Sequence, residues 1–202
     1  VVQRSLFYEP GRQNNRQFGN VTKVEERAAA GNGWAADPLR TSYTWYVPNF
    51  TVWSNPPPAN AVYIVSKPSR AERHSVCAGC TGGHKDGETQ YFYDGASNYN
   101  TPPSKGLMTK QTSGDFVAQI EYNGNGSVAR QIDGNGRATA FYYDSRFAAF
   151  PVCVKNHYSQ TTISRFYGVP GSSNPACTTS AGSAAWDGGG QPVNGAHFGA
   201  VD

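Results

Sequence analysis

The sequence predicts an all-β fold built from consecutive antiparallel β-hairpins. Aromatic residues make up 13% and charged residues 15% of the 202 residues, with 23 glycines and 13 prolines. Tyr, Phe, Thr and Val suit a pleated, half-buried surface, while Gly, Pro, Asn and Asp set turns. This composition favours many short strands over helices. A second observation, a recurring unit of aromatic strands and glycine turns, points the same way.

The clearest unit lies between Tyr122 and Tyr143, within IEYNGNGSVARQIDGNGRATAFYYDSR. It reads as strand, glycine turn, strand, glycine turn and strand. The two tyrosines stand 21 positions apart (122 to 143), and a polar turn residue, Asn123 or Asp144, follows each. Variants of this unit recur along most of the chain, as expected of a repeat architecture.

The first unit runs from RSLFYEPG, with Tyr8, into the alternating strand of QFGNVTKVEER that follows Gly19. We expect this alternation to turn one side of the strand toward a core and the other toward water. Residues 28–38 (AAAGNGWAADP) are predicted as a surface loop or a short turn of helix.

The second unit is TSYTWYVPN, with Tyr46. Three prolines, Pro56 to Pro58, resist helix and strand alike and predict a stiff surface excursion. The run Val62 to Val65 that follows is apolar enough to lie between two covered faces of a sheet.

The third unit, TQYFYDGASNYNTPPSKGLMTKQTS, carries Tyr93. The unit between Tyr122 and Tyr143 described above is the fourth. The fifth begins at FYYD and continues through RFAAFPVCVKN. A weaker sixth unit is TISRFYGVPG, with Tyr167. From Thr178 the pattern dissolves, and three successive glycines lose much entropy on ordering. We therefore expect a repeat array over residues 1–177 and a Gly-rich tail or arm, in need of a partner, over residues 178–202.

Two sets of residues are expected to build the repeats. The aromatic strand markers are Tyr8, Tyr46, Tyr93, Tyr122, Tyr143 and Tyr167. The turn glycines are Gly19, Gly95, Gly106, Gly124, Gly126, Gly134 and Gly136. Pairs such as Asn123-Gly124 and Asp133-Gly134 are strong hairpin signals because they permit left-handed backbone angles. Since one hairpin is marginal in water, each unit must hydrogen-bond to its neighbour and share an aromatic face with it.

The motifs FYYD, QYFYDG and IEYNGNG, together with the steps GNVTK, GLMTK and GSVAR, resemble the YD-repeat family, also called rearrangement-hotspot or Rhs repeats. The resemblance covers about residues 6–171. It implies β-hairpins wound into a spiralling antiparallel sheet, which in bacterial toxin complexes closes into a hollow shell around a toxic cargo. The Asp-Pro-Leu-Gly-type core that follows the repeats in Rhs toxins has no counterpart here, so neither self-cleavage nor a toxin is expected.

Charge and cysteines restrict the partners and the compartment. The net charge of +3 comes from 17 basic and 14 acidic residues without a clustered basic stripe, so nucleic acid is not expected. No window approaches 18 apolar residues, so no membrane span is predicted. For Cys77, Cys80, Cys153 and Cys177, disulfides are favoured over free thiols and over a metal site, because extracellular chains usually oxidise their cysteines. These features favour an extracellular or bacterial cell-surface protein without a cofactor.

No catalytic motif joins the dispersed histidines, so an enzyme is not expected. A Cys-His nucleophile using Cys77 or Cys80 with His74 or His84 is the weaker reading. Residues 133–136 (DGNG) fit a hairpin turn better than a calcium loop. The four tryptophans are candidates for stacking on sugars, although packing in the sheet is the commoner fate of such residues: Trp34, Trp45, Trp53 and Trp186.

The predicted function is structural: a wall segment of an Rhs/YD-repeat shell or a surface assembly. Its partners would be other copies of the chain or the rest of a larger repeat protein. Two alternatives stay open. One is a self-associating subunit of an extracellular filament that uses the terminal arm. The other is a carbohydrate-binding or adhesive module that relies on exposed aromatic residues.

Overall fold

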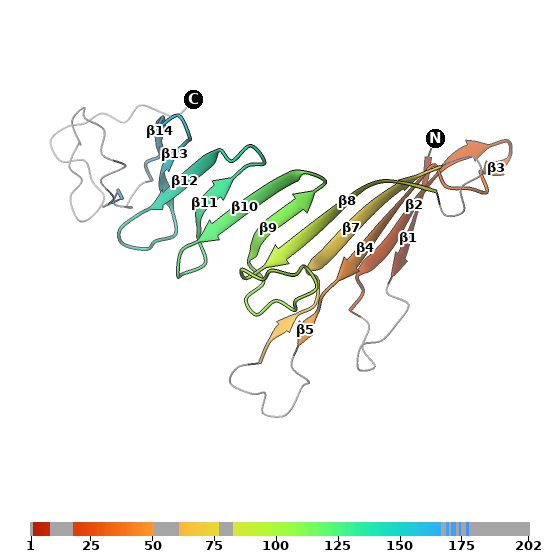
Figure 1. Ribbon diagram of the computed structural model, residues 1–202, viewed down its shortest axis with the longest axis horizontal. Helices are drawn as coiled ribbons and strands as arrows, with labels where there is room; N and C mark the ends of the chain where they lie inside the picture. The colour runs from red at the N-terminus through yellow and green to blue at the C-terminus, as the bar shows by residue number, and fades with distance from the viewer. Residues whose placement is uncertain are drawn as a thin grey trace. The chain divides into compact units, whose positions relative to one another are not determined.

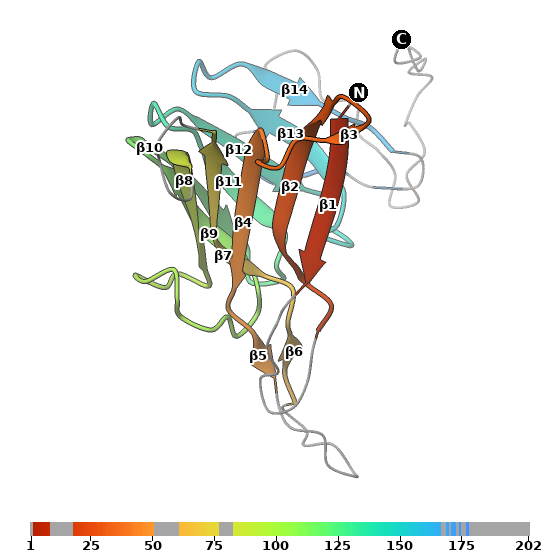
Figure 2. The ribbon, with the colours of Figure 1, turned by 90° about the vertical axis from the view of Figure 1, so that its right-hand side faces the viewer.

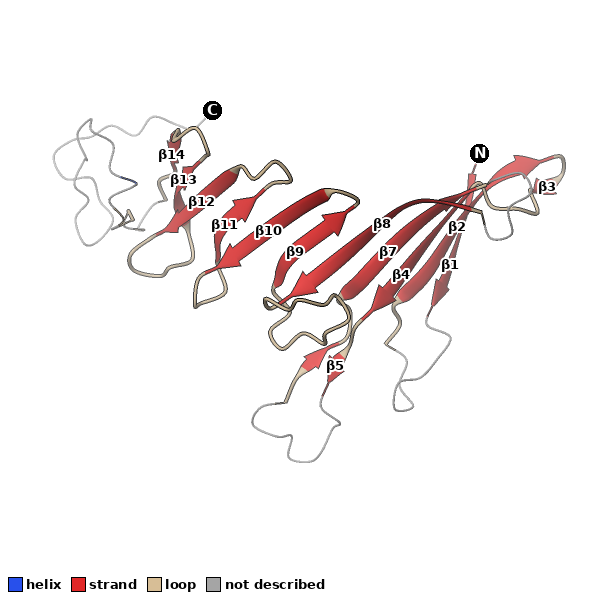
Figure 3. Ribbon diagram, viewed as in Figure 1, coloured by secondary structure: helices blue, strands red, loops and turns tan. Residues whose placement is uncertain are grey.

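The computed structural model describes residues 2–8, 18–50, 61–76, 83–166, 169, 171–172, 174 and 177. These residues form fourteen β-strands, and no α-helix occurs among them (Figure 3). The all-β prediction with antiparallel, hairpin-like strand order is therefore confirmed. The chain divides into two compact units, Val1–Val117 and Ala118–Asp202, with the boundary inside β10 (Phe116–Tyr122).

The first unit contains an antiparallel sheet in the order β1-β2-β4-β7-β8-β9, in which most neighbours in the sheet also follow one another along the chain (Figure 1). The strands are β1 (Val2–Tyr8), β2 (Val21–Ala30), β4 (Arg40–Tyr46), β7 (Pro68–Ser75), β8 (His84–Tyr93) and β9 (Met108–Ser113). The excursions between β2 and β4 and between β4 and β7 leave the sheet and return to it.

Both excursions differ from the sequence-based expectation. Residues 28–38 are neither a loop nor a helical turn throughout, because β2 continues to Ala30 and forms a hairpin with β3 (Gly33–Trp34). The run Val62 to Val65 does not lie between two covered faces. Only β6 (Tyr63–Ile64) is extended, and it pairs with β5 (Asn49–Phe50) beyond the ends of β4 and β7 (Figure 2).

A small aromatic cluster explains this placement. The Phe18 ring lies 5.1 Å from the Phe50 ring and 6.3 Å from the Tyr63 ring, both in edge-on contacts. The apolar side chains of the excursion therefore pack on one another at the end of the sheet, and Tyr63 remains 66% exposed. Apolarity alone did not distinguish this arrangement from a buried strand.

The second unit continues β10 into an antiparallel sheet in the order β10-β11-β12-β13-β14. Its further strands are β11 (Val128–Ile132), β12 (Ala138–Tyr143), β13 (Pro151–Lys155) and β14 (Thr161–Ile163). The predicted pattern of strand, glycine turn, strand, glycine turn and strand is confirmed by β10, β11 and β12. The weaker sixth unit, which begins at Thr162, supplies only the last two residues of the three-residue β14, and Tyr167 lies outside the described residues.

The two glycine turns of the second unit share one geometry. The N–H of Asn123 donates to the Ser127 carbonyl (2.8 Å), and the N–H of Gly126 donates back to the Asn123 carbonyl (2.9 Å). Asp133 and Gly136 repeat these bonds at 3.0 and 2.9 Å. This is the three-residue hairpin loop, in which only the last loop residue is left-handed. Accordingly φ is positive at Gly126 (+86°) and Gly136 (+76°), whereas the first glycine of each turn, expected to be left-handed, is not.

Few side chains are deeply buried in the part of the chain that the structure describes. The buried hydrophobic residues are Val47, Phe92, Tyr93, Val152 and Cys153. The alternation in β2 does not separate a core side from a water side, contrary to expectation. Glu25 is only 7% exposed, yet its carboxylate forms ion pairs with Lys23 and Arg27 on the same face. Burial there comes from neighbouring polar side chains.

The turn geometry predicts a difference between two neighbouring glycines. Gly126→Ala should lower the free energy of unfolding by about 1 kcal/mol, because a left-handed backbone is costly for residues with a Cβ. No atom lies within 4 Å of the Cβ position at either Gly126 or Gly124, so a clash would not contribute. Gly124→Ala is the matched control and should be neutral or slightly stabilising. Urea denaturation of the two variants measures the difference, and equal losses would contradict the assigned turn.

Candidate functional site

A pairing irregularity precedes every marker tyrosine that the structure describes. The register shifts fall between Phe7 and Tyr8, Trp45 and Tyr46, Phe92 and Tyr93, Glu121 and Tyr122, and Tyr142 and Tyr143. A β-bulge bends its strand and re-aims the side chain beside it. The repeated motif therefore carries a repeated bulge, which sequence reasoning did not reveal.

Tyr46, Tyr93 and Tyr143 each hydrogen-bond the strand next to their own. The hydroxyl of Tyr46 donates to the Val21 carbonyl at 3.0 Å. The hydroxyl of Tyr93 donates to the Pro68 carbonyl at 2.8 Å, and that of Tyr143 to the Val128 carbonyl at 2.9 Å. Each acceptor is the first residue of the adjacent strand, in β2, β7 and β11 respectively. We call this contact the tyrosine latch.

The latches connect successive repeats within each unit. Val21 pairs with Tyr8, and Pro68 pairs with Tyr46, so each acceptor in the first unit also pairs with the preceding marker. In the second unit, Val128 pairs with Tyr122 in the same way. Tyr46, Tyr93 and Tyr143 are therefore each linked to the preceding marker through a single intervening residue. The strands that carry the marker tyrosines alternate in the sheet with strands that carry none.

Tyr93 shows why a phenol is needed at this position. Its side chain is 4% exposed, and burial, followed by the nearby Tyr91, raises the pKa of Tyr93 to about 12. A buried hydroxyl without a partner would cost free energy, and the Pro68 carbonyl supplies that partner. Phenylalanine would fill the same volume without the bond.

The aspartate that follows the tyrosine organises a loop when the loop is long. Asp144 is 2% exposed, and its Oδ1 accepts the backbone N–H groups of Arg146 and Phe147. Its Oδ2 accepts those of Ala149 and Phe150, both at 3.0 Å. Burial alone would raise the pKa of this carboxyl, but the four N–H donors outweigh it and lower the pKa to about 2.

Asp94 repeats this arrangement in the first unit. Its Oδ2 accepts the N–H groups of Ser104 (2.7 Å), Lys105 (2.8 Å) and Gly106 (3.1 Å), and its Oδ1 accepts that of Leu107 (2.9 Å). These donors also hold the pKa of Asp94 below its usual value against the opposing effect of burial. In the tight turns, a side-chain oxygen of Asp133 accepts only the nearby N–H groups of Asn135 and Arg137.

Gly106 completes the Asp94 loop for two reasons. Its φ is +76°, and a Cβ at this position would lie 3.1 Å from Cε of Lys67. The remaining predicted glycines also have positive φ, at Gly19 (+72°) and Gly95 (+77°). Glycine is therefore required at these turns by backbone conformation, and at Gly106 also by limited space.

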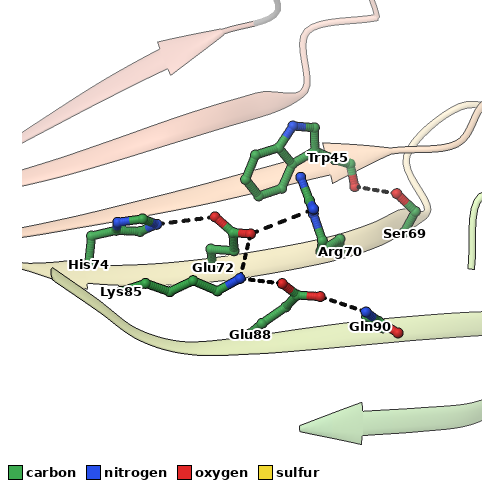
Figure 4. Close-up of polar contacts among 8 residues, drawn as sticks. All are labelled: Trp45, Ser69, Arg70, Glu72, His74, Lys85, Glu88 and Gln90. Carbon is green, nitrogen blue, oxygen red and sulfur yellow. Dashed lines mark hydrogen bonds and ion pairs between the residues drawn. The ribbon is translucent and has the colours of Figure 1, made fainter. Parts of the chain in front are cut away.

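One face of the first unit carries a network of charges (Figure 4). Glu72 lies at its centre and contacts His74 Nε2 (3.1 Å), Lys85 Nζ (2.9 Å) and, more distantly, Arg70 Nη1 (3.6 Å). Burial would raise the pKa of Glu72, but the hydrogen bonds from Lys85 and His74 lower it. Lys85 also contacts Glu88. The sequence did not predict this network, because its residues meet only when β7 and β8 pair in the sheet.

The same face accounts for one tryptophan proposed to stack on sugars. The guanidinium carbon of Arg70 lies 4.0 Å from the centre of the Trp45 ring (Figure 4). That ring face is therefore already occupied by a cation. Trp34 in β3 is 41% exposed, whereas Trp53 and Trp186 lie outside the described residues.

The opposite face of β4, β7 and β8 contains a shallow hollow of about 370 Å³. Side chains alternate between faces along a strand, so the hollow lies behind the charge network. Its lining includes small and hydroxyl-bearing residues, namely Ser42, Thr44, Ala71, Gly87, Thr89 and Ser113, together with Arg73, Asp86 and Tyr91.

The cysteine prediction is confirmed for one pair. Cys153 and Cys177 form a disulfide with a Cα–Cα distance of 5.9 Å, and Cys153 is 1% exposed. The bond anchors the segment after β14 to β13. Cys77 and Cys80 lie outside the described residues.

His74 and His84 occupy polar contacts, whereas the His157 ring lies 3.7 Å from the Tyr158 ring. His74 bonds Glu72, and Nδ1 of His84 lies 3.4 Å from Oδ1 of Asp86. Among residues that the structure describes, no group of three or more His, Cys, Asp or Glu side chains could hold a metal ion. The same residues contain no helix of the length and apolarity that a membrane-crossing helix requires.

Comparisons with known proteins give no family for this chain. No family model matches its sequence, and no curated protein matches it.

The tyrosine latch predicts a specific loss of stability. Tyr143→Phe should lower the free energy of unfolding by about 1 kcal/mol, because it removes one hydrogen bond and leaves the Val128 carbonyl without this donor. Tyr142→Phe is the control, since no hydrogen bond to the Tyr142 hydroxyl occurs within the described residues. Urea denaturation of both variants decides the matter. A latch that contributes nothing would give two indistinguishable curves.

The Asp144 loop predicts acid sensitivity. Because the folded pKa is lowered from 3.8 to about 2, the carboxylate stabilises the fold above pH 4 and loses this effect as the pH falls toward 2. Asp144→Asn should cost about 2 kcal/mol at pH 7 and flatten the dependence of stability on pH in this window. The measurement is urea denaturation from pH 5 to 2, with the exposed Asp115→Asn as control. An unchanged slope in Asp144→Asn would be inconsistent with this role.

Proposed function

We propose that this chain is a structural, extracellular β-repeat protein that forms a wall segment of a YD/Rhs-like shell or surface assembly. The observation that carries the proposal is the tyrosine latch, which recurs in both units at the end of successive strand pairs. A device that joins each repeat to the preceding one suits a sheet that is extended by adding repeats. The resemblance of the tyrosine motifs to YD repeats supports the same architecture.

The polarity of the first unit's sheet also supports a wall. Layered domains bury one apolar face of a sheet against another element. Here one face carries the Glu25 and Glu72 ion pairs, and the opposite face carries Ser42, Thr44 and Arg73. Two polar faces suit a single sheet with solvent on either side, held together by pairing between strands.

The ends of the strand order indicate how such a wall would continue. Within the described residues, β1 pairs only with β2 and β14 pairs only with β13. Along β1, Val2 is 59% exposed and Leu6 is 48% exposed. An exposed apolar edge strand is a template for another strand. That strand would come from another copy or from the rest of a larger repeat protein.

The disulfide supports the proposed compartment. Disulfides persist in oxidising environments and are rare in reducing cytosol. The Cys153–Cys177 bond therefore favours an extracellular or bacterial cell-surface location. It would also fix the end of the second unit against unfolding outside the cell.

Association through the β1 edge tests the proposal. The purified chain should associate with increasing concentration in light scattering, and Leu6→Lys should weaken association at least tenfold by placing a charge on the edge. Leu39→Lys is the matched control, because Leu39 is 50% exposed but lies between strands. Electron microscopy of the associated material separates a filament from short sheet-like pieces. A chain that remains monomeric at millimolar concentration, or equal effects of both variants, would overturn edge-mediated assembly.

A further inference from the structure

The hollow behind the charge network has a lining that fits a ligand. It owes its depth to small residues in register on adjacent strands: Thr44 pairs with Ala71, which pairs with Thr89. Next to this row, Arg73 pairs with Gly87, which has no side chain. The surface of the sheet is therefore lower between two larger side chains, Arg73 and Tyr91. A volume of about 370 Å³ is at the small end of ligand sites.

Polar side chains that could contact a ligand surround the hollow. Arg73 is exposed and forms no ion pair within the described residues, unlike Arg70 on the other face, which pairs with Glu72. Asp86 is oriented by the Ser75 hydroxyl, which donates to its Oδ1 at 2.6 Å. Four side-chain hydroxyls line the hollow, from Ser42, Thr44, Thr89 and Ser113, and that of Thr89 donates to that of Ser113 at 3.5 Å.

The spacing of these groups defines the size of the ligand. Arg73 is in register with Gly87, and Tyr91 lies four residues further along β8. This separation corresponds to about 13 Å of strand. One sugar ring stacked on Tyr91 and a second beside Arg73 and Asp86 would span it, and the hydroxyls between them would bond ring hydroxyls.

We propose that the hollow formed by Arg73, Asp86, Gly87 and Tyr91 binds a neutral saccharide of two or more pyranose rings. The charges favour a neutral ligand, because the guanidinium of Arg73 is balanced by the carboxylate of Asp86 on the same side. Glu72 and Glu88 also line the hollow, but their carboxylates are paired with Lys85 in the charge network. Arg73 donates to sugar hydroxyls, Asp86 accepts from them, and Tyr91 supplies an apolar ring for the face of the sugar. This site is separate from the tryptophans that the sequence suggested.

Gly87 provides a variant that fills the hollow without straining the fold. Its φ is not in the left-handed region, and a Cβ at this position would meet no atom within 4 Å. Gly87→Val should therefore keep or raise the melting temperature, because valine suits a strand, while its side chain occupies the floor of the hollow.

Titration followed by NMR chemical shifts tests the proposal with cellotetraose and maltotetraose as neutral probes and tetragalacturonate as an acidic one. At least one neutral probe should bind with a millimolar Kd. Gly87→Val should abolish binding, and Tyr91→Ala should weaken it about tenfold. Tyr63→Ala, which alters an exposed tyrosine elsewhere, should leave it unchanged.

Three outcomes would overturn the proposed site. The first is the absence of shifts with both neutral probes at tens of millimolar concentration, and the second is binding that survives Gly87→Val. The third is tighter binding of tetragalacturonate than of either neutral probe, which would make the ligand an acidic saccharide. None of these results depends on association through β1, because the titrations are performed on Leu6→Lys. A failure of this site is thus distinguishable from a failure of the proposed assembly.

Discussion

The hydrogen bond from a marker tyrosine to the first carbonyl of the adjacent strand is the contact on which each sheet depends. A sheet with polar groups on both faces gains little from apolar burial, and few hydrophobic side chains are buried in the described residues. Pairing between strands must then provide most of the order. A bulge brings each tyrosine to the end of its strand, where its hydroxyl fixes the start of the neighbouring strand. Local turn chemistry and strand register are thereby coupled.

The aspartate and glycine of the motif order the loops between strands, whereas the tyrosine bonds the neighbouring strand. Long loops such as the one after Asp144 would leave several backbone N–H groups unpaired as they return to the sheet. One carboxylate accepts four of them at Asp144, and Asp94 accepts four in its own loop. In the short turn after Asn123, the backbone bonds are joined by a local side-chain bond, in which Asn125 Oδ1 accepts the N–H of Ser127. At Tyr93 and Tyr143 the aspartate after the tyrosine thus accompanies a longer loop, whereas Asn123 accompanies a short one.

Local signals explain what the sequence predicted well. The turns around Gly126 and Gly136 depend on residues within five positions, so the strands β10, β11 and β12 could be placed from sequence. The run from Val62 to Val65 was misplaced because its packing partner, Phe18, lies far away in the sequence. The same limit hid the candidate saccharide site. Tyr91 and Arg73 were unremarkable until the register of β7 and β8 placed both beside Gly87. Trp45, in contrast, was a candidate for sugar stacking from the sequence, and only the structure revealed that Arg70 lies over its ring.

The most direct test of the repeat architecture is to remove one complete strand pair. Deleting residues 123–143 joins Tyr122 to Asp144, so that β10 takes the place of β12 and retains the motif before the Asp144 loop. We predict that the shortened chain remains folded, with a circular-dichroism spectrum typical of β-structure, a cooperative thermal transition and the Cys153–Cys177 disulfide. A disordered spectrum, or a transition without cooperativity, would show that the strand pairs are not interchangeable units.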